Sequence, residues 1–546
     1  YGFGGSQNTY DLSMTGGCYA QAVSDFASAD ASAVRLAVAE ASPSTTVKLA
    51  GYCPGTAFED NGNQMLQIDK FLVLAGGYSP SNWTTADLVG QPTTLDAMNG
   101  GRVISATGKL DLMGFTVQHG FGDFGGGLSL QGTTVMTSMM FYRNTVDYSG
   151  GGAYVSDRAF ISNTNFIENV AVDSGGGLWA DATQIFGGQV QGNRAGLDGA
   201  GIYADVSLVL FGATLDSNVA QANGGGAHAG SDFNYVEAEF FSNEAGQGGG
   251  LYSSGSVTVI DSAFLGNSAT QAGDGAAAVG FMTVNNGTFT ANNSVYGGAL
   301  FAYDTLNMEN SLLTFNSATN GGAVLGQSGL IVNRTTFADN TATAGGGALG
   351  QASFLTAQQN APAGGTTPYA KLFNNLFARN SAASGLDLAF GLPANNVLEH
   401  NTFYANGHPA PASIVVLDGS LAAHNSLFSG YAKALQRAGS ASVSEDYNLY
   451  FGGGGAVSSY FSGTVTSGGH SLVADPLLAD PLLADAPNGD FRLTYASPAR
   501  DRGLNQLIPV DHDGDPRPYG VGVDIGYDEL TGYPLLYLPL VLRLAP

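Results

Sequence analysis

Several aspartates stand just before glycine-rich turns, at spacings that would stack them in a repeating structure. Asp147 and Asp173 are 26 residues apart, Asp173 and Asp198 are 25 apart, and Asp274 approximately continues the series. Enzymes that hydrolyse polysaccharides use two carboxyl groups roughly 5–10 Å apart. A row of stacked aspartates would supply such a pair, or would bind a cation weakly. The alternative is structural, because aspartate favours turns and bonds its own backbone there.

A second acidic motif lies near the C-terminus, at Asp511, Asp513 and Asp515. The D-x-D-G-D order is similar to a calcium-binding loop, and calcium is the only cofactor that the sequence suggests. The position of the bidentate acid of an EF-hand is occupied by Gly522, so the loop is incomplete in that respect. The alternative is that these aspartates and Arg517 hold the end of the fold together by hydrogen bonds.

No other set of residues has the spacing of a catalytic or metal site. The polygalacturonase-type signatures N-T-D, G-H-G and R-I-K are absent. The histidines are scattered through the chain: His119, His228, His400, His408, His424, His470 and His512. We therefore expect no catalytic residues and no cofactor other than calcium at the weak candidate Asp511, Asp513 and Asp515.

The elements that must position these residues belong to one repeat. Glycine-rich turns recur with nine intervals over 220 residues, and nearly all are followed by an apolar residue three positions before an asparagine. Two markers in phase at this period predict a solenoid. The turns begin at Gly125, Gly150, Gly175, Gly199, Gly224, Gly248, Gly275, Gly297, Gly321 and Gly345. The asparagines are Asn144, Asn169, Asn193, Asn218, Asn243, Asn267, Asn292, Asn316, Asn340, Asn380 and Asn406.

Each repeat has the pattern of short strands. Val257 and Val259 alternate with Thr258 and Ile260 before Phe264 closes the segment. Period-two alternation between Gly, Ser, Asn and Asp predicts strands joined by turns. Three such strands need about two dozen residues, so one repeat forms one coil of a parallel β-helix, with coils about 4.8 Å apart.

The two markers have structural explanations. The glycines turn the backbone through positive φ, where a Cβ would clash. The phenylalanines are expected to stack in an internal column. The asparagines are expected to form a ladder in which each amide bonds the next coil, at about 1 kcal/mol per bond.

The ends of the chain depart from the repeat. Residues 31–41 have helical spacing of apolar residues before Pro43, which predicts a short helix that covers the first coil. The predicted organisation is an N-terminal cap over 1–60, a β-helix over 61–430 with an insertion at 357–370, irregular C-terminal rungs and a cap over 431–530, and an apolar tail over 531–546. We expect the tail to pair as an edge strand, on its own solenoid or on a neighbour.

Composition excludes several classes of partner. The net charge of −26 argues against binding of nucleic acid or anionic membranes. The chain contains no stretch of 18 apolar residues, so no transmembrane helix is expected.

Cys18 and Cys53 would form a disulfide in an exported protein; the alternative is two unrelated buried thiols. The first residue is Tyr1, which suits removal of a signal peptide, so we expect an extracellular or cell-surface location.

The Gly-Gly-Ala-like turns and F-x-x-N tetrads resemble the repeats of polymorphic outer-membrane proteins and related bacterial surface proteins. These belong to the right-handed parallel β-helix class that also contains pectate lyases. The segments 76–83 and 92–97, and the closing S-P-A-R-D-R-G, D-G-x-P-R and D-I-G series, are similar to secreted bacterial β-helix proteins of unassigned function. The resemblance implies an all-β, right-handed parallel β-helix on a bacterial surface.

The function predicted from these features is that of an extracellular structural protein without enzymatic activity. A rigid solenoid of this kind would assemble with itself into a filament or sheath, or would display adhesive contacts, for example on the 357–370 insertion. The alternative is a polysaccharide-binding or polysaccharide-cleaving β-helix of the pectate-lyase type. The expected partners are therefore other copies of the chain and surface carbohydrate.

Overall fold

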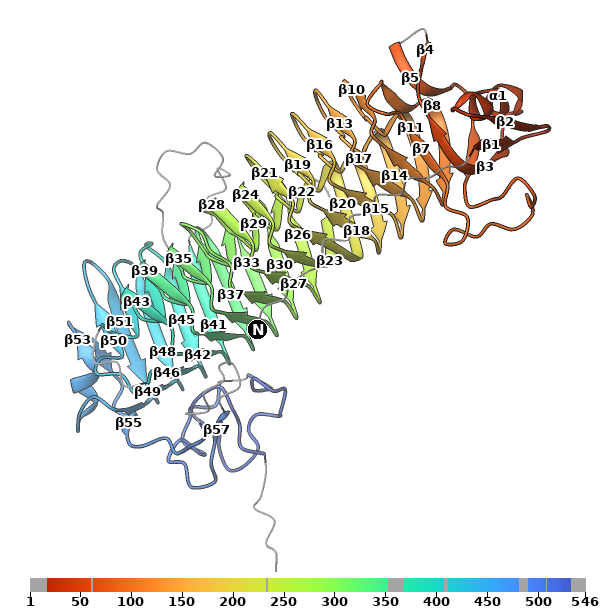
Figure 1. The fold of residues 1–546 in the computed structure, drawn as a ribbon. Coiled ribbons are helices and arrows are strands. Elements are labelled where there is room, and N and C mark those ends of the chain that lie inside the picture. Colours follow the sequence, from red (N-terminus) through yellow and green to blue (C-terminus); the bar gives the residue numbers. More distant parts are fainter. Residues whose placement is uncertain are drawn as a thin grey trace, which may run out of the picture. The chain divides into compact units, whose positions relative to one another are not determined.

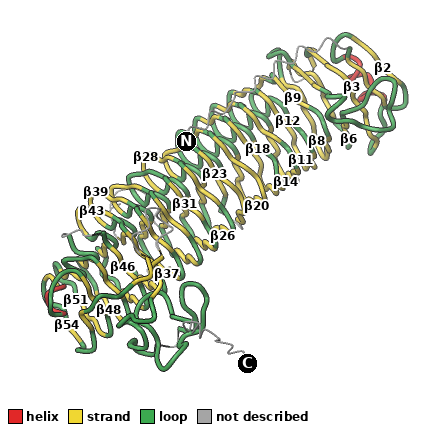
Figure 2. The backbone as a smooth tube through the Cα atoms, turned by 60° about the horizontal axis from the view of Figure 1, so that its bottom comes forward, coloured by secondary structure: helices red, strands yellow, loops and turns green. Residues whose placement is uncertain are grey.

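The chain folds as a parallel β-solenoid, which confirms the predicted all-β class (Figures 1 and 2). The computed structural model describes residues 17–59, 62–231, 234–351, 368–406, 411–480, 490–506 and 508–531. It has two units, residues 1–246 with 250–252 and residues 247–249 with 253–546. Strand partners in neighbouring coils are mostly 24 to 26 residues apart, consistent with a right-handed β-helix. The predicted insertion at 357–370 and tail at 531–546 lie almost wholly outside the described residues.

The first unit begins with a covered end. Helix α1 (Ser32–Glu40) packs on β1, β2 and β3 and buries Ala33, Val34, Ala37 and Val38, at the place where a short helix was predicted. Cys18 and Cys53 form a disulfide between β1 and β3. The strands of this part are β1 (Cys18–Gln21), β2 (Asp25–Ser28), β3 (Thr45–Pro54), β4 (Ala57–Glu59), β5 (Gly62–Ile68), β6 (Leu72–Ala75) and β7 (Thr94–Asp96).

The regular coils of the first unit follow. A long strand in most coils bends from one face to the next: β8 (Arg102–Met113), β11 (Leu128–Thr137), β14 (Ala153–Ser162), β17 (Leu178–Phe186), β20 (Ile202–Asp216), and the shorter β22 (Ala227–Ala229) and β23 (Asn234–Phe241). The strands with the F-x-x-N residue are β9 (Thr116–Gln118), β12 (Met140–Tyr142), β15 (Asn165–Ile167) and β18 (Gln189–Gln191). The third face has β10 (Phe121–Gly122), β13 (Thr145–Val146), β16 (Val170–Ala171), β19 (Arg194–Ala195) and β21 (Val219–Ala220), and β24 (Glu244–Gln247) and β25 (Leu251–Ser253) span the boundary between the units.

The second unit continues with three strands per coil. After the glycine turns come β29 (Ala276–Ala278), β32 (Leu300–Ala302), β36 (Val324–Gly326), β40 (Leu349–Gln351), β44 (Leu388–Phe390), β47 (Ile414–Val416), β50 (Leu435–Arg437) and β53 (Phe461–Ser462). The middle strands are β26 (Val257–Ile260), β30 (Met282–Asn285), β33 (Leu306–Glu309), β37 (Gly329–Asn333), β41 (Tyr369–Phe373), β45 (Asn395–Glu399), β48 (Ser420–His424), β51 (Ser442–Asp446) and β54 (Thr466–Ser467).

The remaining elements of the second unit are two strand columns, a 3₁₀ turn and a hairpin. The F-x-x-N column has β27 (Ala263–Leu265), β31 (Thr288–Thr290), β34 (Leu312–Thr314), β38 (Thr336–Ala338), β42 (Leu376–Ala378), β46 (Thr402–Tyr404), β49 (Leu427–Ser429), β52 (Leu449–Phe451) and β55 (Leu472–Val473). The other column has β28 (Ser268–Ala272), β35 (Ser317–Asn320), β39 (Thr341–Gly345) and β43 (Ser381–Ser384); η1 (Val457–Tyr460), β56 (Leu478–Asp480) and β57 (Asp490–Leu493) complete the set.

The glycine turns need residues without a side chain. Gly175 has a φ of +68°, and a Cβ there would lie 2.6 Å from the carbonyl oxygen of Leu178. Two predicted turn positions were wrong: the positive-φ glycines of those coils are Gly273 and Gly346, in place of Gly275 and Gly345. In these two coils the turn therefore begins two residues earlier and one residue later than predicted, respectively.

The asparagine ladder runs through the core as continuous hydrogen bonds. The side-chain oxygen of Asn193 accepts hydrogen bonds from the backbone N–H and the amide of Asn169. The amide of Asn193 donates to the oxygen of Asn218 and to the carbonyl of Phe166. The ladder bonds join Asn144, Asn169, Asn193, Asn218 and Asn243 in the first unit, and Asn267, Asn292, Asn316, Asn340 and Asn380 in the second.

Asn406 does not belong to the ladder, and its predicted place there was wrong. Its side chain is exposed. The amide of Asn380 donates instead to the buried carboxylate of Asp387, at 3.0 Å. Asp387 also accepts hydrogen bonds from Ser413 and Tyr431, so it ends the ladder inside the core.

A second polar column in the second unit was missed. Asn375 donates to the side-chain oxygen of Asn401, the N–H of Asn401 donates to Ser426, and the N–H of Ser426 donates to Asn448. The sequence contains a signal for it, because each of these asparagines stands two residues before an aromatic residue of the F-x-x-N strand. The aromatic column itself has nearly parallel rings, as in Phe377 and Phe403, which are 4.7 Å apart.

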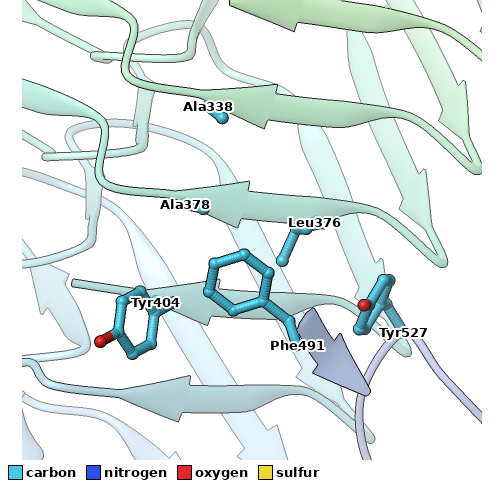
Figure 3. Packing of buried hydrophobic residues seen from close by; sticks show 6 residues of the cluster. All are labelled: Ala338, Leu376, Ala378, Tyr404, Phe491 and Tyr527. Atoms are coloured by element: carbon cyan, nitrogen blue, oxygen red, sulfur yellow. The ribbon is translucent and has the colours of Figure 1, made fainter. Parts of the chain in front are cut away.

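The chain leaves the coils after β55 and returns along the side of the second unit. Phe491 and Tyr527 from this returning segment pack on Leu376, Ala378 and Tyr404 (Figure 3). We call residues 490–531 the cap. The cap therefore covers the outer face of the F-x-x-N column rather than the end of the last coil.

Replacing Asn193 by Ala tests the ladder. The change removes four hydrogen bonds and leaves buried polar groups of Asn169 and Phe166 unpaired, so we expect a loss of about 2–5 kcal/mol in local stability. Hydrogen exchange in β15, β18 and β20 is the measurement, because a solenoid opens coil by coil. Asn406→Ala is the matched control, and equal effects of both changes would contradict the ladder.

Candidate functional site

The predicted acidic row does not form. The N–H of Asp173 bonds the carbonyl of Tyr148, whereas the N–H of Asp198 bonds the hydroxyl of Ser174. Asp147, Asp173 and Asp198 therefore occupy three successive positions of the turn rather than one stacked position. The carboxylate of Asp198 accepts two hydrogen bonds from Asn223, both at 2.9 Å, which is a structural role.

Asp274 lies in the core instead of on the surface. It follows the positive-φ Gly273, and its side chain is fully buried. Burial raises the pKa of Asp274 to about 9, and the backbone N–H of Ala269 offsets only part of that effect. Neither carboxylate oxygen has a partner at good hydrogen-bonding geometry. Such a group cannot serve as one of a pair of exposed catalytic carboxylates.

The Asp511 motif is a structural loop. One oxygen of Asp511 accepts hydrogen bonds from the N–H groups of Gly514 and Asp515, and the other accepts one from Glu529. Asp515 accepts a hydrogen bond from the hydroxyl of Thr531. Across the described part of the chain, no group of three or more His, Asp or Glu side chains has the geometry to hold a metal ion. Asp511 and Asp515 therefore tie this loop to the C-terminal end of the described chain at Glu529 and Thr531.

Arg517 is the polar centre of the cap. Its guanidinium is buried and lies 3.1 Å from the carboxylate of Glu529. It also donates to the backbone carbonyls of Asp524 and Gly526 and is 2.9 Å from Nδ1 of His400, which lies on the coils. Burial and the neighbouring Arg517 hold the pKa of His400 well below its usual value, so the imidazole beside Arg517 is neutral. This network attaches the cap to the solenoid.

The sequence reasoning missed an aromatic row on the first unit. The rings of Tyr154, Trp179, Tyr203, His228 and Tyr252 stack from coil to coil, with centroids 4.5, 6.0, 4.8 and 5.2 Å apart. The row follows the first residues of β14, β17, β20, β22 and β25. The signal in the sequence is an aromatic residue followed by Ala-Asp at Trp179 and again at Tyr203, 24 residues later.

An acidic row lies beside the aromatic row. Asp157, Asp181 and Asp205 follow its rings at the next bend of the chain, and the hydroxyl of Tyr203 donates to Asp205 at 3.2 Å. Desolvation, with smaller contributions from Asp205 and Asp157, raises the pKa of Asp181 above its usual value. Desolvation, together with Asp205, raises the pKa of Tyr203 to about 12. We call Tyr154, Trp179, Tyr203 and these three aspartates the lateral stripe.

The geometry of the lateral stripe decides what it can bind. Trp179 is nearly parallel to both Tyr154 and Tyr203, with 13° between the ring planes. Neighbouring rings therefore cover each other's faces, and the exposed parts are ring edges, hydroxyls and carboxylates. A ligand would be bound by hydrogen bonds repeated at the spacing of the coils rather than by stacking on a ring face.

No known protein family matches the chain, and no curated protein is similar to it at a significant level. The resemblance of the repeats to polymorphic outer-membrane proteins and pectate lyases therefore has support at the level of the fold alone. None of the helical segments in the described residues is long and apolar enough to cross a membrane.

Asp274 predicts a specific pH dependence of stability. Its pKa is raised in the folded state, so the unfolded chain loses the proton from about pH 4 upward while the folded chain keeps it to about pH 9. Stability from this residue therefore falls as the pH rises through that window. Asp274→Asn should raise the thermal midpoint at pH 8 and have little effect at pH 4.5. Asp147→Asn, at an exposed position, is the control, and a shift from Asp274→Asn that is the same at both pH values would contradict the assignment.

Arg517→Met tests the attachment of the cap. The change leaves Glu529 buried without its partner, a loss of about 3–5 kcal/mol for a buried pair. We expect faster hydrogen exchange in β57 and at residues 499–529, with no change in β30, β33 and β34. Arg502→Met, at an exposed arginine of the same cap, should leave exchange unchanged. Unaltered protection of the cap in Arg517→Met would refute the role of this network.

Proposed function

We propose that the chain is an extracellular, non-enzymatic solenoid that displays adhesive contacts on its side. The lateral stripe carries this proposal, because it places the same donor and acceptor groups on successive coils of a rigid support. A ligand with a regular repeat, such as a surface polysaccharide, would meet several of these groups at once. Several weak contacts on one rigid support give tighter binding than any single contact.

The internal ladders support a role as a rigid support. The asparagine amides of each unit form hydrogen bonds with neighbouring coils, and the phenylalanines pack on each other. These columns therefore stabilise the fold. The disulfide between Cys18 and Cys53 suits an oxidising, extracellular location. The low content of charged residues, 11%, leaves the remaining surface to small polar residues.

Adhesive display is favoured over head-to-tail assembly. Among the described residues, α1 and the antiparallel pair β1 and β2 cover the N-terminal end of the first unit. That end therefore offers no free parallel strand to the end of another copy. Protein that forms fibres in electron micrographs at micromolar concentration would reverse this preference.

One observation favours a second function, cleavage of a polysaccharide. Asp181 and Asp205 lie on adjacent coils, and the pKa of Asp181 is raised in part by Asp205. A carboxyl group with a raised pKa beside a second carboxyl group is typical of a general acid and its partner. The exposed position of Asp205 makes binding without cleavage the better-supported proposal.

The two functions can be separated in one set of experiments. Purified protein is presented to neutral and acidic polysaccharides, with retention as the measure of binding and reducing ends or unsaturated products as the measure of cleavage. Trp179→Ala and Tyr203→Ala should each weaken binding at least tenfold by disordering the lateral stripe. Phe160→Ala, at an exposed aromatic residue outside the stripe, is the control.

The results decide between the proposals as follows. Binding without products supports adhesive display. Products that disappear in Asp181→Asn, with binding retained, would establish the enzymatic function instead. No binding to any polysaccharide, or equal binding by the Trp179→Ala protein, would exclude the lateral stripe as a carbohydrate-binding surface.

A further inference from the structure

The last coil of the second unit ends in an unpaired edge. Strand β55 pairs with β52, and within the described residues no strand pairs with its other side. The cap packs on the outer faces of β38, β42, β46, β49 and β52 and on Leu472, but none of its described strands pairs along this edge. An open edge exposes backbone donors and acceptors that native proteins normally cover or block.

Two adjoining cavities connect this edge with the end of the cap. The first, of about 410 Å³, is lined by Leu472 and Val473 of β55 and by Tyr495, Pro498 and Arg502 of the cap. The second, of about 230 Å³, extends to Tyr519, Val521 and Leu530. Tyr495, Arg500 and Asp501 line both. We call the two cavities together the trough.

The walls of the trough are held in place by hydrogen bonds. Asp501 accepts hydrogen bonds from the N–H groups of Val521 and Gly522 at 2.9 and 3.0 Å. The guanidinium of Arg500 bonds Asp501 and lies 4.2 Å from the centre of the Tyr495 ring. The surface has a defined shape because Asp501 and Arg500 hold its walls by hydrogen bonds.

The fixed walls expose apolar side chains. Val521 is 97% exposed, Tyr495 51% and Tyr519 42%, all beside the trough. A valine held in this position leaves nearly all of its apolar surface in water, which is unfavourable. Apolar groups arranged around a cavity are typical of a docking surface.

The chain itself supplies a segment that fits this surface. Leu530 lines the trough, and Thr531 is fixed by its bond to Asp515, so the following residues start beside the trough. Residues 533–544 read Y-P-L-L-Y-L-P-L-V-L-R-L, with Arg543 as their one charged residue. Twelve extended residues reach up to about 40 Å. This length is ample for crossing the trough to β55.

We propose that residues 533–544 fold back along the trough and pair with the free edge of β55 as its missing neighbour. The leucines would cover Tyr495 and Val521, and the backbone would pair with β55. Pro534 and Pro539 cannot donate hydrogen bonds, so a strand that contains them suits the outer edge of a sheet. A strand with these prolines would also stop a second copy from adding to the same edge.

Hydrogen exchange provides the first test. In the full chain the backbone amides of 472–474 should be protected, and removal of residues 532–546 should raise their exchange at least tenfold. Exchange in β30, β33 and β34 should stay constant. A synthetic peptide of residues 532–546 should restore the protection when added to the shortened chain. Equal exchange at 472–474 with and without the tail would overturn the proposal.

A second variant guards against a shortened chain that misfolds. In the full chain, Leu535→Asp with Leu538→Asp should expose 472–474 in the same way, whereas Leu535→Met with Leu538→Met should not. Unchanged protection in the Asp variant would count against docking of this segment.

Cross-linking identifies the occupant of the trough. In a Val521→Cys, Leu536→Cys chain, mild oxidation should give a disulfide within one molecule. Mixing isotopically labelled and unlabelled chains tells this from a bond between two molecules. A bond formed mainly between molecules would show that the tail of a second copy occupies the trough. No bond at all would show that neither the chain's own tail nor that of a second copy lies there. Both results would refute the proposal.

Discussion

The structure of both units depends on one constraint, that equivalent residues of successive coils lie directly above one another. The asparagine ladder makes this constraint strict. Each buried amide needs the oxygen of the next asparagine and the carbonyl of a coil already formed, as Asn193 does with Asn218 and Phe166. A shift of one residue would leave several buried polar groups unpaired, each at a cost of about 1–3 kcal/mol. The ladder therefore defines the register of every strand that follows.

This constraint applies to the core positions and not to the length of the chain between them. Asn340 bonds Asn380 with the same geometry as its neighbours, although 40 residues separate the two instead of 24 or 25. The extra residues between Asn340 and Asn380 therefore leave the bond of the ladder intact.

The features that were predictable from the sequence are those that the core constraint repeats. The coil length and the position of Asn193 follow from periodic residues whose role is the same in every coil. Asn406 fails because the F-x-x-N pattern is local, whereas membership in the ladder depends on the neighbouring coil, where Asp387 already provides the acceptor. The F-x-x-N tetrapeptide alone does not show that Asp387, rather than Asn406, accepts the hydrogen bond from Asn380.

The outer surface was predicted less well for a physical reason. Asp147, Asp173 and Asp198 stand near turns, where one extra residue before the glycine moves a side chain to another position without any cost to the core. The aromatic residues of the lateral stripe are regularly spaced but mix Tyr and Trp, so no single residue type marks it. A search for chemically similar residues at the coil spacing, rather than for identical ones, would have found Trp179 and Tyr203.

The cap shows how an irregular segment acquires a unique position on a regular solenoid. The apolar contacts of Phe491 and Tyr527 supply buried area, but successive coils offer similar apolar strips and area alone does not choose among them. Arg517 resolves this ambiguity because its donors meet Glu529, the carbonyls of Asp524 and Gly526, and the single neutral His400 on the coils. A shift by one coil would lose His400 and leave a buried charge without part of its network. The same attachment holds Val521 at one place beside the trough. A trough with fixed walls can exist there only because the cap has a single docking position.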